Sequence, residues 1–314
     1  MQTERIAVID LGTNTFHLLI VEIVGVNVKT VYSEKTAVRI GKGGINQGII
    51  TEDACERAIS TMVIFKEKAN ALFTSKIYAT ATSAFRNARN GEQLAERIKD
   101  KTGIAISIIS GDREAELIYY GVKEALELGK EKSLIVDIGG GSVEFIIANE
   151  ETIFWKQSFE IGGQRLMELF QKTDPITSSE ILTLKNYIDE MLAPLHKALL
   201  KFPTKILVGS SGSFDTFSDI DLVKKGNEPS IVPKNEYVLP LNDFGIIYTE
   251  LISKDREERI KIPGMIELRV DMIVVASVLV DFLLTRYTIE KLRISSYALK
   301  EGVLSRILKG ESIK

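Results

Sequence analysis

Two aspartates, Asp10 and Asp137, are candidate functional residues, because each ends a run of apolar residues and precedes a turn of small residues. An apolar run of this length predicts a buried strand, which would present the carboxylate at its end. The turns, residues 12–15 and 139–142, can direct successive backbone N–H groups at one anion. This pattern favours a site where N–H groups bind phosphate beside carboxylates that hold Mg²⁺.

The two segments are copies of one unit. Residues 6–20 align on residues 133–147 without a gap, and the alignment places Asp10 on Asp137. Each copy contains an apolar strand, an acidic end, a turn of small residues and a returning apolar strand. Repetition of such a unit over a long separation indicates two related halves. We therefore expect two related α/β domains whose turns face one cleft.

The returning strands of the two copies differ at one position of interest. Glu144 of the second copy aligns with His17 of the first. A carboxylate suits Mg²⁺ better than an imidazole does, so Glu144 is the stronger candidate ligand. The other histidine, His196, lies in an amphipathic helix predicted over residues 178–201, and we interpret it as a packing or surface residue. A chain with two histidines has few candidate ligands for a zinc site and few candidate bases for a Ser-His-Asp triad.

A further polar segment, residues 79–90, follows a short predicted strand and contains small hydroxyl residues with Arg86 and Arg89 behind them. Such residues can cap a helix and do nothing more. They can also meet a phosphate, which backbone N–H groups and an arginine fork would hold. The residues alone favour neither interpretation.

Glu114 lies in the first turn of a helix that we expect to begin near Asp112. Acidic residues are common at this position because they complement the helix dipole, so the position by itself does not indicate catalysis. Another turn of small residues, at 209–217, follows a short strand and opens a helix.

The composition is that of a soluble globular protein, since the 314 residues are 45% hydrophobic and 26% charged. The net charge of −3 gives no sign of a nucleic-acid binder. The single cysteine, Cys55, excludes an internal disulfide, fits a reducing compartment and is interpreted as structural. The first residues are too polar for a signal peptide, and the apolar run 272–284 is too short to span a bilayer. We expect a cytoplasmic protein without a membrane partner.

Hydrophobic periodicity divides the chain into two groups of elements. A three-stranded meander over residues 6–40 opens the first group, and the second hairpin begins after residues 129–132 without a low-complexity linker. We predict a first domain from residues 1–127 together with 298–314, and a second domain from residues 128–297.

With these segments in place, the chain resembles the exopolyphosphatase / guanosine pentaphosphate phosphohydrolase family over its whole length. The resemblance rests on six segments in the family's order and spacing: residues 10–18, 81–90, 110–115, 137–144, 209–213 and 298–304. It implies the actin-like fold of ribonuclease H-like and sugar-kinase ATPases, with two domains related by duplication. Longer family members continue into helical HD-type domains that extend a polyphosphate channel, and this sequence stops near the end of the two-domain core.

The resemblance also implies a role for each matching residue. Glu114 would activate the attacking water, and Mg²⁺ would be held by Asp10, Asp137 and Glu144. Phosphate groups would be bound by Arg86 and by residues of the three turns: Gly12, Thr13, Asn14, Thr15, Gly139, Gly140, Gly141, Ser142, Gly212 and Ser213. Family members often pair, so we expect a homodimer.

The departures from the family pattern are modest. Thr13 and Thr15 stand where serines are usual, which keeps the hydroxyl and adds a methyl group. Ser213 stands where threonine is frequent, and Arg113 precedes Glu114 where many members carry an acid.

The leading hypothesis is a Mg²⁺-dependent exopolyphosphatase that releases terminal phosphate from inorganic polyphosphate by in-line attack of water. Hydrolysis of guanosine pentaphosphate would use the same site, and the residues do not separate the two substrates. A sugar-kinase-type enzyme and a non-catalytic alarmone-binding regulator would share the fold. Glu114 argues against both, because neither needs a carboxylate that activates water.

Overall fold

The computed structural model describes residues 3–227 and 235–313. The chain forms two compact units, Met1–Glu114 with Val303–Lys314, and Ala115–Gly302. The division therefore falls inside two helices, α4 (Gly111–Ala125) and α12 (Leu299–Leu308). The domain limits expected from the sequence lie between elements instead, and they remain a prediction.

The first unit contains a five-stranded sheet in the order β3-β2-β1-β4-β5. Strands β1, β2 and β3 pair antiparallel, while β4 and β5 continue the sheet in parallel with β1. The bounds of its strands and helices are β1 (Thr3–Leu11), β2 (Thr15–Val24), β3 (Asn27–Ala37), β4 (Lys76–Ala81), β5 (Ile106–Ile108), α1 (Glu52–Ala71), α2 (Ser83–Asn87) and α3 (Gly91–Thr102).

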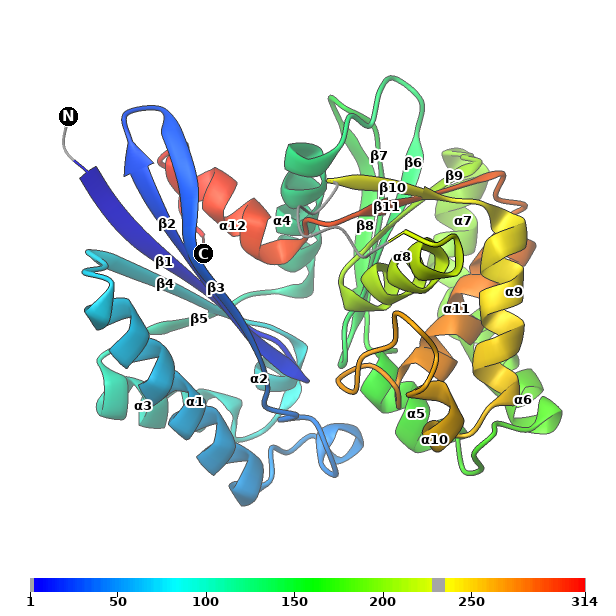
Figure 1. The fold of residues 1–314 in the computed structure, drawn as a ribbon, viewed down its shortest axis with the longest axis horizontal. Coiled ribbons are helices and arrows are strands. Elements are labelled where there is room, and N and C mark those ends of the chain that lie inside the picture. The colour runs from blue at the N-terminus through cyan, green and yellow to red at the C-terminus, as the bar shows by residue number, and fades with distance from the viewer. Residues whose placement is uncertain (1–2, 228–234, 314) are drawn as a thin grey trace. The chain divides into compact units, whose positions relative to one another are not determined.

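Alternation along β1 divides its side chains between two cores. Ala7, Ile9 and Leu11 belong to the core that α1 and α3 cover on one face of the sheet (Figure 1). Ile6 belongs to a smaller cluster that includes Leu304 of α12. Successive side chains of a strand point to opposite faces, so β1 is buried on both sides and carries Asp10 near its end.

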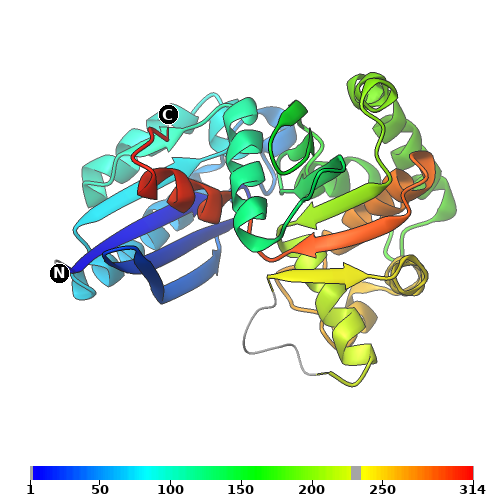
Figure 2. The same cartoon turned by 90° about the horizontal axis from the view of Figure 1, so that it is seen from above.

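The second unit contains a six-stranded sheet in the order β10-β11-β9-β6-β7-β8, with β10 at one edge (Figure 2). The bounds are β6 (Ser133–Ile138), β7 (Val143–Ala148), β8 (Ile153–Phe159), β9 (Ile206–Ser210), β10 (Glu236–Leu239), β11 (Lys291–Ser295), α5 (Gly163–Phe170), α6 (Ser178–Met191), α7 (Ala193–Lys201), α8 (Gly212–Lys224), α9 (Leu241–Ser253), α10 (Arg256–Arg259) and α11 (Ile273–Arg286). Helix α11 is buried almost all round, as its continuous apolar sequence predicts.

Strand pairing confirms the repeat expected from the sequence. The order β8-β7-β6-β9-β11 has the same parallel and antiparallel pairings as β3-β2-β1-β4-β5. Asp10 lies opposite His17, and Asp137 lies opposite Glu144, so the aligned residues occupy equivalent places in the two sheets. The predicted α/β class with two related sheets is therefore confirmed.

The helix expected over residues 178–201 is wrong, because two helices occupy this segment and meet at Leu192. Pro194 lies in the first turn of α7, where its missing N–H costs nothing. Its ring would clash with the backbone inside a continuous helix, so the chain restarts there. The exposed loop expected over residues 226–232 lies largely outside the described residues.

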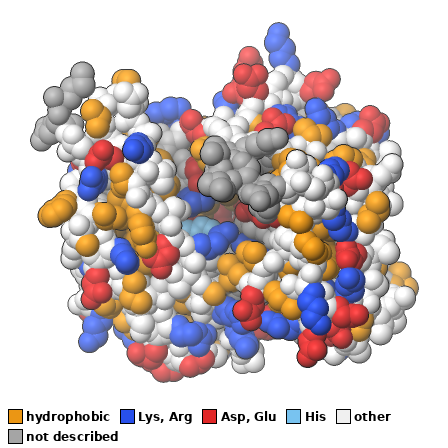
Figure 3. Space-filling model, in the orientation of Figure 1, with side chains coloured by type: hydrophobic (Ala, Val, Ile, Leu, Met, Phe, Trp, Pro, Cys, Tyr) orange, Lys and Arg blue, Asp and Glu red, His pale blue; other side chains and the backbone are white. Residues whose placement is uncertain are grey.

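Within residues 3–227 and 235–313, no helix is long and apolar enough to cross a membrane. On the face that Figure 3 shows, basic and acidic side chains are interspersed, in keeping with the net charge of −3.

Candidate active site

Each repeat places a tight turn directly after its aspartate. The N–H of Gly12 donates to the carbonyl of Thr15 at 3.1 Å, and the N–H of Gly139 donates to the carbonyl of Ser142 at 3.0 Å. A Cβ atom at either glycine would lie 3.0 Å from that same carbonyl oxygen. Close approach of backbone to backbone therefore accounts for the glycine in both copies.

The second turn directs its carbonyl groups towards helix α5. The N–H groups of residues 162, 163 and 164 donate to the carbonyls of Gly141, Gly139 and Gly140 at 3.1, 2.9 and 2.9 Å. In a trans peptide the N–H points away from the preceding carbonyl, so the N–H groups of Gly140, Gly141 and Ser142 face the other way. None of these three N–H groups bonds to a residue that the structure describes. Such a row of N–H groups can bind an anion.

The first turn repeats this arrangement with different partners. The carbonyl of Thr13 accepts from the N–H of Gly41 at 3.1 Å, and the carbonyl of Asn14 accepts from the N–H groups of Val38 and Arg39 at 3.0 and 2.9 Å. Thr13, Asn14 and Thr15 are buried. The carbonyl groups thus bond to the loop after β3, which leaves the opposite side of the turn to the N–H groups.

Two buried carboxylates lie side by side at the end of the second sheet. Asp137 and Glu144 are opposite residues of an antiparallel pair and so share one face, and they are 7% and 1% exposed. The hydroxyl of Ser210 donates to Asp137 Oδ2 at 2.7 Å, and the hydroxyl of Ser158 donates to Glu144 Oε1 at 2.7 Å. Burial raises the pKa of Asp137, against the opposing effects of the Ser210 hydrogen bond and the charge of Arg269.

This donor pair fits Mg²⁺, which proteins usually bind through one or two carboxylates together with water and phosphate oxygens. A cation would also offset the cost of burying charge at Asp137. No cluster of three or more acidic, histidine or cysteine side chains in the described parts of the chain could hold a metal ion. Asp10 belongs to the first unit, and its share in a metal site stays a prediction.

The structure brings together two residues that the resemblance singled out 28 positions apart. Arg86 Nη1 donates to Glu114 Oε2 at 2.8 Å and to the carbonyl of Ile109 at 3.1 Å. The side chains of Arg86 and Glu114 are 17% and 8% exposed. The ion pair fixes the Glu114 carboxylate in one orientation, and its charge assists the hydrogen bond.

Two residues near the Arg86–Glu114 pair, Thr82 and Arg113, had no settled role from the sequence alone. Thr82 occupies the N-cap of α2, but its side chain makes no capping hydrogen bond, so the capping interpretation of this segment is wrong there. The guanidinium of Arg113 donates to the carbonyls of Ser312 and Ile313 at 2.6 and 3.3 Å. The basic residue beside Glu114 is therefore tied to the end of the chain.

The third turn, after β9, opens helix α8 and carries an unusual backbone. Ser211 has φ 75° and ψ 172°, a region that is essentially restricted to glycine and costs on the order of 1–3 kcal/mol. The predicted phosphate residues Gly212 and Ser213 follow it at the buried start of α8. The residue before Ser211, Ser210, donates its hydroxyl to Asp137. The strain thus coincides with the carboxylate site.

Arg269 is a residue of this region that the sequence analysis missed. A Cβ at Gly212 would lie 1.8 Å from Arg269 Nη2, so the guanidinium packs directly on the first turn of α8. Arg269 is 8% exposed, and burial lowers its pKa while the charges of Asp215 and Asp137 raise it. Its sequence signal was weak, because it is a single arginine preceding an apolar helix.

The other singled-out residues serve packing. His196 lies between Asp189 and Tyr287, with Nδ1 2.6 Å from the tyrosine hydroxyl. Cys55 is buried in the core beneath α1. Both outcomes agree with the structural interpretation.

Comparison with known proteins places the chain in a family. The model of the Ppx/GppA phosphatase family matches residues 19–311, so the chain belongs to that family. Exopolyphosphatase 1 of Mycobacterium tuberculosis is 27% identical over 311 residues, which are 98% of this chain and 89% of that protein.

Solved structures agree over nearly the whole chain. A protein described as an exopolyphosphatase from Cytophaga hutchinsonii has 44% identity and a TM-score of 0.96, with 99% of each chain covered. The Ppx/GppA family member of Aquifex aeolicus has 25% identity and a TM-score of 0.80, covering 99% of this chain and 100% of that one. The fold is the actin-like ATPase fold, and the protein is an enzyme of the phosphoanhydride hydrolase class.

Proposed function

We propose that this protein is a Mg²⁺-dependent exopolyphosphatase, which hydrolyses the terminal phosphoanhydride bond of inorganic polyphosphate and releases orthophosphate. The observation that carries the proposal is the pair of equivalent turns whose carbonyl groups are bonded to their own unit. This arrangement directs the backbone N–H groups of both turns away from the protein backbone, where phosphate oxygens can accept from them. The likeness to a Cytophaga hutchinsonii exopolyphosphatase supports the same choice of substrate.

Phosphoryl transfer needs positioning and charge neutralisation more than covalent chemistry. The N–H groups of residues 140–142, and those of the first turn, would hold the oxygens of the phosphate being removed and of its neighbour. Arg86 would share its guanidinium between Glu114 and a phosphate oxygen. These fixed donors would stabilise the charge that develops on the transferred group.

Glu114 would act as the general base. One of its oxygens accepts from Arg86, and the other would accept a hydrogen bond from water and then its proton. The oriented water would attack phosphorus in line with the bridging oxygen that leaves.

Asp137 and Glu144, with Asp10 from the other repeat, would hold Mg²⁺. When bound, the ion supplies positive charge beside the phosphates. Before binding, the chain's own contribution is the hydroxyl groups of Ser210 and Ser158, which keep the two carboxylates in place.

The test is phosphate release from inorganic polyphosphate and from guanosine pentaphosphate, measured at equal concentrations with Mg²⁺ present. We expect release from both substrates through one site, with polyphosphate the better substrate. Release from guanosine pentaphosphate alone would replace the proposed substrate, and release from neither would refute the proposed activity.

A further inference from the structure

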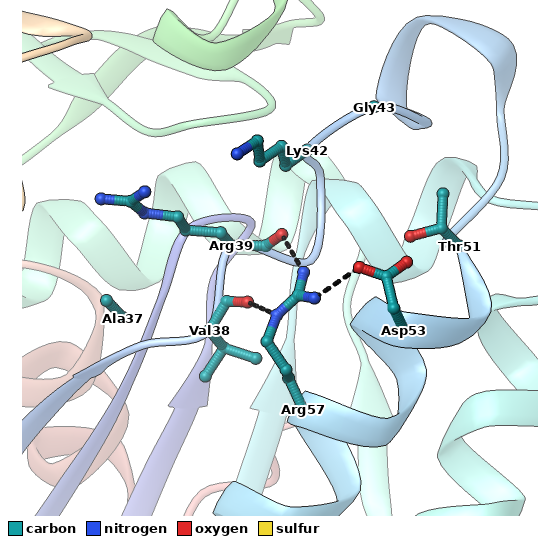
Figure 4. Close-up of a pocket in the computed structure, with 8 residues that line it drawn as sticks. All are labelled: Ala37, Val38, Arg39, Lys42, Gly43, Thr51, Asp53 and Arg57. Carbon is teal, nitrogen blue, oxygen red and sulfur yellow. Dashed lines mark hydrogen bonds and ion pairs between the residues drawn. The ribbon is translucent and has the colours of Figure 1, made fainter.

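The loop after β3 forms a basic pocket next to the first turn. The pocket has a volume of about 580 Å³ and lies wholly within the first unit. Its walls come from residues 37–39, 42–43, Thr51, Asp53 and Arg57 (Figure 4). Three of these residues are basic and one is acidic, although the chain as a whole has a net charge of −3.

Backbone hydrogen bonds attach this loop to the predicted phosphate turn. Val38 and Arg39 donate to the carbonyl of Asn14, and Gly41 donates to the carbonyl of Thr13. The loop therefore keeps a fixed position relative to residues 12–15. A cation on this loop is therefore held at a fixed position relative to the turn that would bind phosphate.

Arg57 has a structural part in the pocket. It donates to the carbonyls of Val38 and Arg39 at 2.9 and 3.2 Å, and to Asp53 Oδ2 at 2.6 Å. Its charge is thereby matched by Asp53, and its hydrogen bonds to the two carbonyls hold the loop. The hydrogen bonds and the charge of Arg57 are therefore satisfied within the protein. The other two basic residues of the pocket are Arg39 and Lys42.

Arg39 and Lys42 differ from Arg57 in having no such partners. In the described part of the chain, neither the guanidinium of Arg39 nor the ammonium group of Lys42 makes a hydrogen bond or an ion pair. Figure 4 shows both side chains extending to the same side, away from the Arg57–Asp53 pair. Arg39 also has φ 52°, a left-handed conformation that costs roughly 1–2 kcal/mol in an L-residue. The bonds to Asn14 and Arg57 hold this conformation and so set the direction of the side chain.

We propose that Arg39 and Lys42 form a second phosphate subsite, which binds the part of a polyphosphate chain beyond the phosphoryl group that is removed. The identity of the ligand rests on the proposed function. A linear polyanion presents negative charge at every repeat, so two neighbouring cations can attract phosphates of the chain other than the one that is removed. The subsite would favour long chains over short ones.

The test compares a double variant, Arg39→Asn with Lys42→Gln, against the unmodified protein. Asparagine is chosen at position 39 because it tolerates the left-handed conformation. Lys29→Gln is the control, since it removes one exposed lysine near the distal end of β3. The measurements are KM for tripolyphosphate, long-chain polyphosphate and guanosine pentaphosphate, and equilibrium binding of long-chain polyphosphate at several salt concentrations without divalent cations.

We expect the affinity for long-chain polyphosphate to fall about tenfold in the double variant, because two charges at the surface are lost. The slope of log affinity against log salt should fall by about 1.5, because two fewer contacts release counterions. The rise in KM should be largest for the long chain and smallest for tripolyphosphate. Lys29→Gln should match the unmodified protein in every measurement.

Equal losses for tripolyphosphate and long chains would overturn the subsite, as would an unchanged affinity or a loss confined to guanosine pentaphosphate. If the unmodified protein binds polyphosphate without hydrolysing it, the proposed function fails while the binding comparison still decides the subsite. If it does not bind polyphosphate at all, both proposals fail.

Discussion

The pair formed by Arg86 and Glu114 illustrates how single residues define the candidate chemistry. Each has an ordinary structural interpretation, since Glu114 suits the first turn of a helix and Arg86 suits the last turn of a short one. Their contact at 2.8 Å in a largely buried setting gives the carboxylate a fixed orientation. A general base needs such an orientation before its protonation state matters.

Glu114→Gln should lower turnover by about 10²–10⁴-fold, because the amide cannot accept the proton of water. The affinity for polyphosphate should change little, since the amide oxygen can still accept from Arg86 and keep that phosphate donor in place. Steady-state phosphate release gives both quantities. Asp112→Asn, an exposed change in the same helical turn, is the control; turnover of Glu114→Gln close to that of this control would exclude Glu114 as the base.

Asp137→Asn should raise the Mg²⁺ concentration needed for half-maximal activity by about tenfold or more, because a ligand is lost.

The same change should raise the free energy of unfolding at pH 7 without Mg²⁺. Burial raises the pKa of Asp137 above its ordinary value of 3.8, so the ionised form costs stability above that pH and nothing below it. The gain should vanish as the pH falls below about 3.8. Metal titration and urea unfolding at several pH values measure the two effects, and an unchanged metal titration would count against ligation by Asp137.

At the scale of elements, the turn after β6 and the start of α5 form one hydrogen-bonded unit. Three carbonyl groups of the turn accept from the first residues of the helix, which sets the direction of the turn's N–H groups. The anion site is therefore a property of the strand, turn and helix together. A change in the helix start should disturb the site without touching a predicted ligand.

Gly162→Ala should lower kcat/KM for polyphosphate by about 10–100-fold, because small displacements of positioning groups have effects of this size. Its Cβ would lie 2.4 Å from the carbonyl carbon of Gly141, so the turn must move. Gly163→Ala is the matched control, since its Cβ would make an ordinary contact 3.5 Å from Met272 Cβ. Equal kinetics for the two variants would show that the turn does not depend on this contact.

Helix α6 begins with a capping box whose stability depends on pH. Partial removal from water raises the pKa of Glu180, but hydrogen bonds from Thr173 and Thr177 outweigh that effect and lower the pKa to about 2. The ionised form therefore stabilises the fold above pH 4.5, and the contribution is lost as the pH falls towards about 2. Glu180→Gln should lower the free energy of unfolding at pH 7 by about 0.5 kcal/mol, since this partly exposed charge is screened by solvent.

Urea unfolding at pH 7 and at pH 3 measures this difference. Glu190→Gln makes the same change near the other end of α6 and should not lower stability. A difference between Glu180→Gln and the unmodified protein that is equal at both pH values would contradict the capping role of the charge.

At the scale of the whole molecule, two helices carry the chain from one compact unit to the other. The division falls after Glu114 in α4 and after Gly302 in α12. Within the second unit these helices approach closely, since a Cβ at Gly302 would lie 1.8 Å from the carbonyl oxygen of Leu117. A Cβ at Gly121 would lie 1.9 Å from the carbonyl oxygen of Ala298. The glycines permit a backbone contact that larger residues would prevent.

Gly302→Ala should therefore lower the free energy of unfolding by about 1–3 kcal/mol, because the two helices must separate. Gly245→Ala is the control, as nothing lies within 4 Å of its added Cβ. In the middle of helix α9 that change should add about 0.5–1 kcal/mol. Thermal or urea unfolding distinguishes the two, and a neutral Gly302→Ala would show that the crossing adjusts without cost.

Local patterns predicted much of this architecture. Apolar runs ending in Asp10 and Asp137 identified the first strand of each sheet, and the gapless alignment placed His17 and Glu144 at matching positions, which the strand register confirms. Pro194 is a sequence signal for the break between α6 and α7. The helical periodicity on both sides of it nevertheless led to the prediction of one continuous helix. These features depend on neighbours in the chain, so the sequence carries their signal.

By itself, the sequence determined the fold class, the repeated unit and the family, because strand periodicity, turn composition and segment order are local or linear properties. Only the tertiary structure decided that Arg86 pairs with Glu114, that Arg269 packs on Gly212, and that residues 38–41 bind the first turn. Each of these contacts joins residues far apart in the chain. Their formation depends on how strands and helices pack in three dimensions, which residue spacing does not encode.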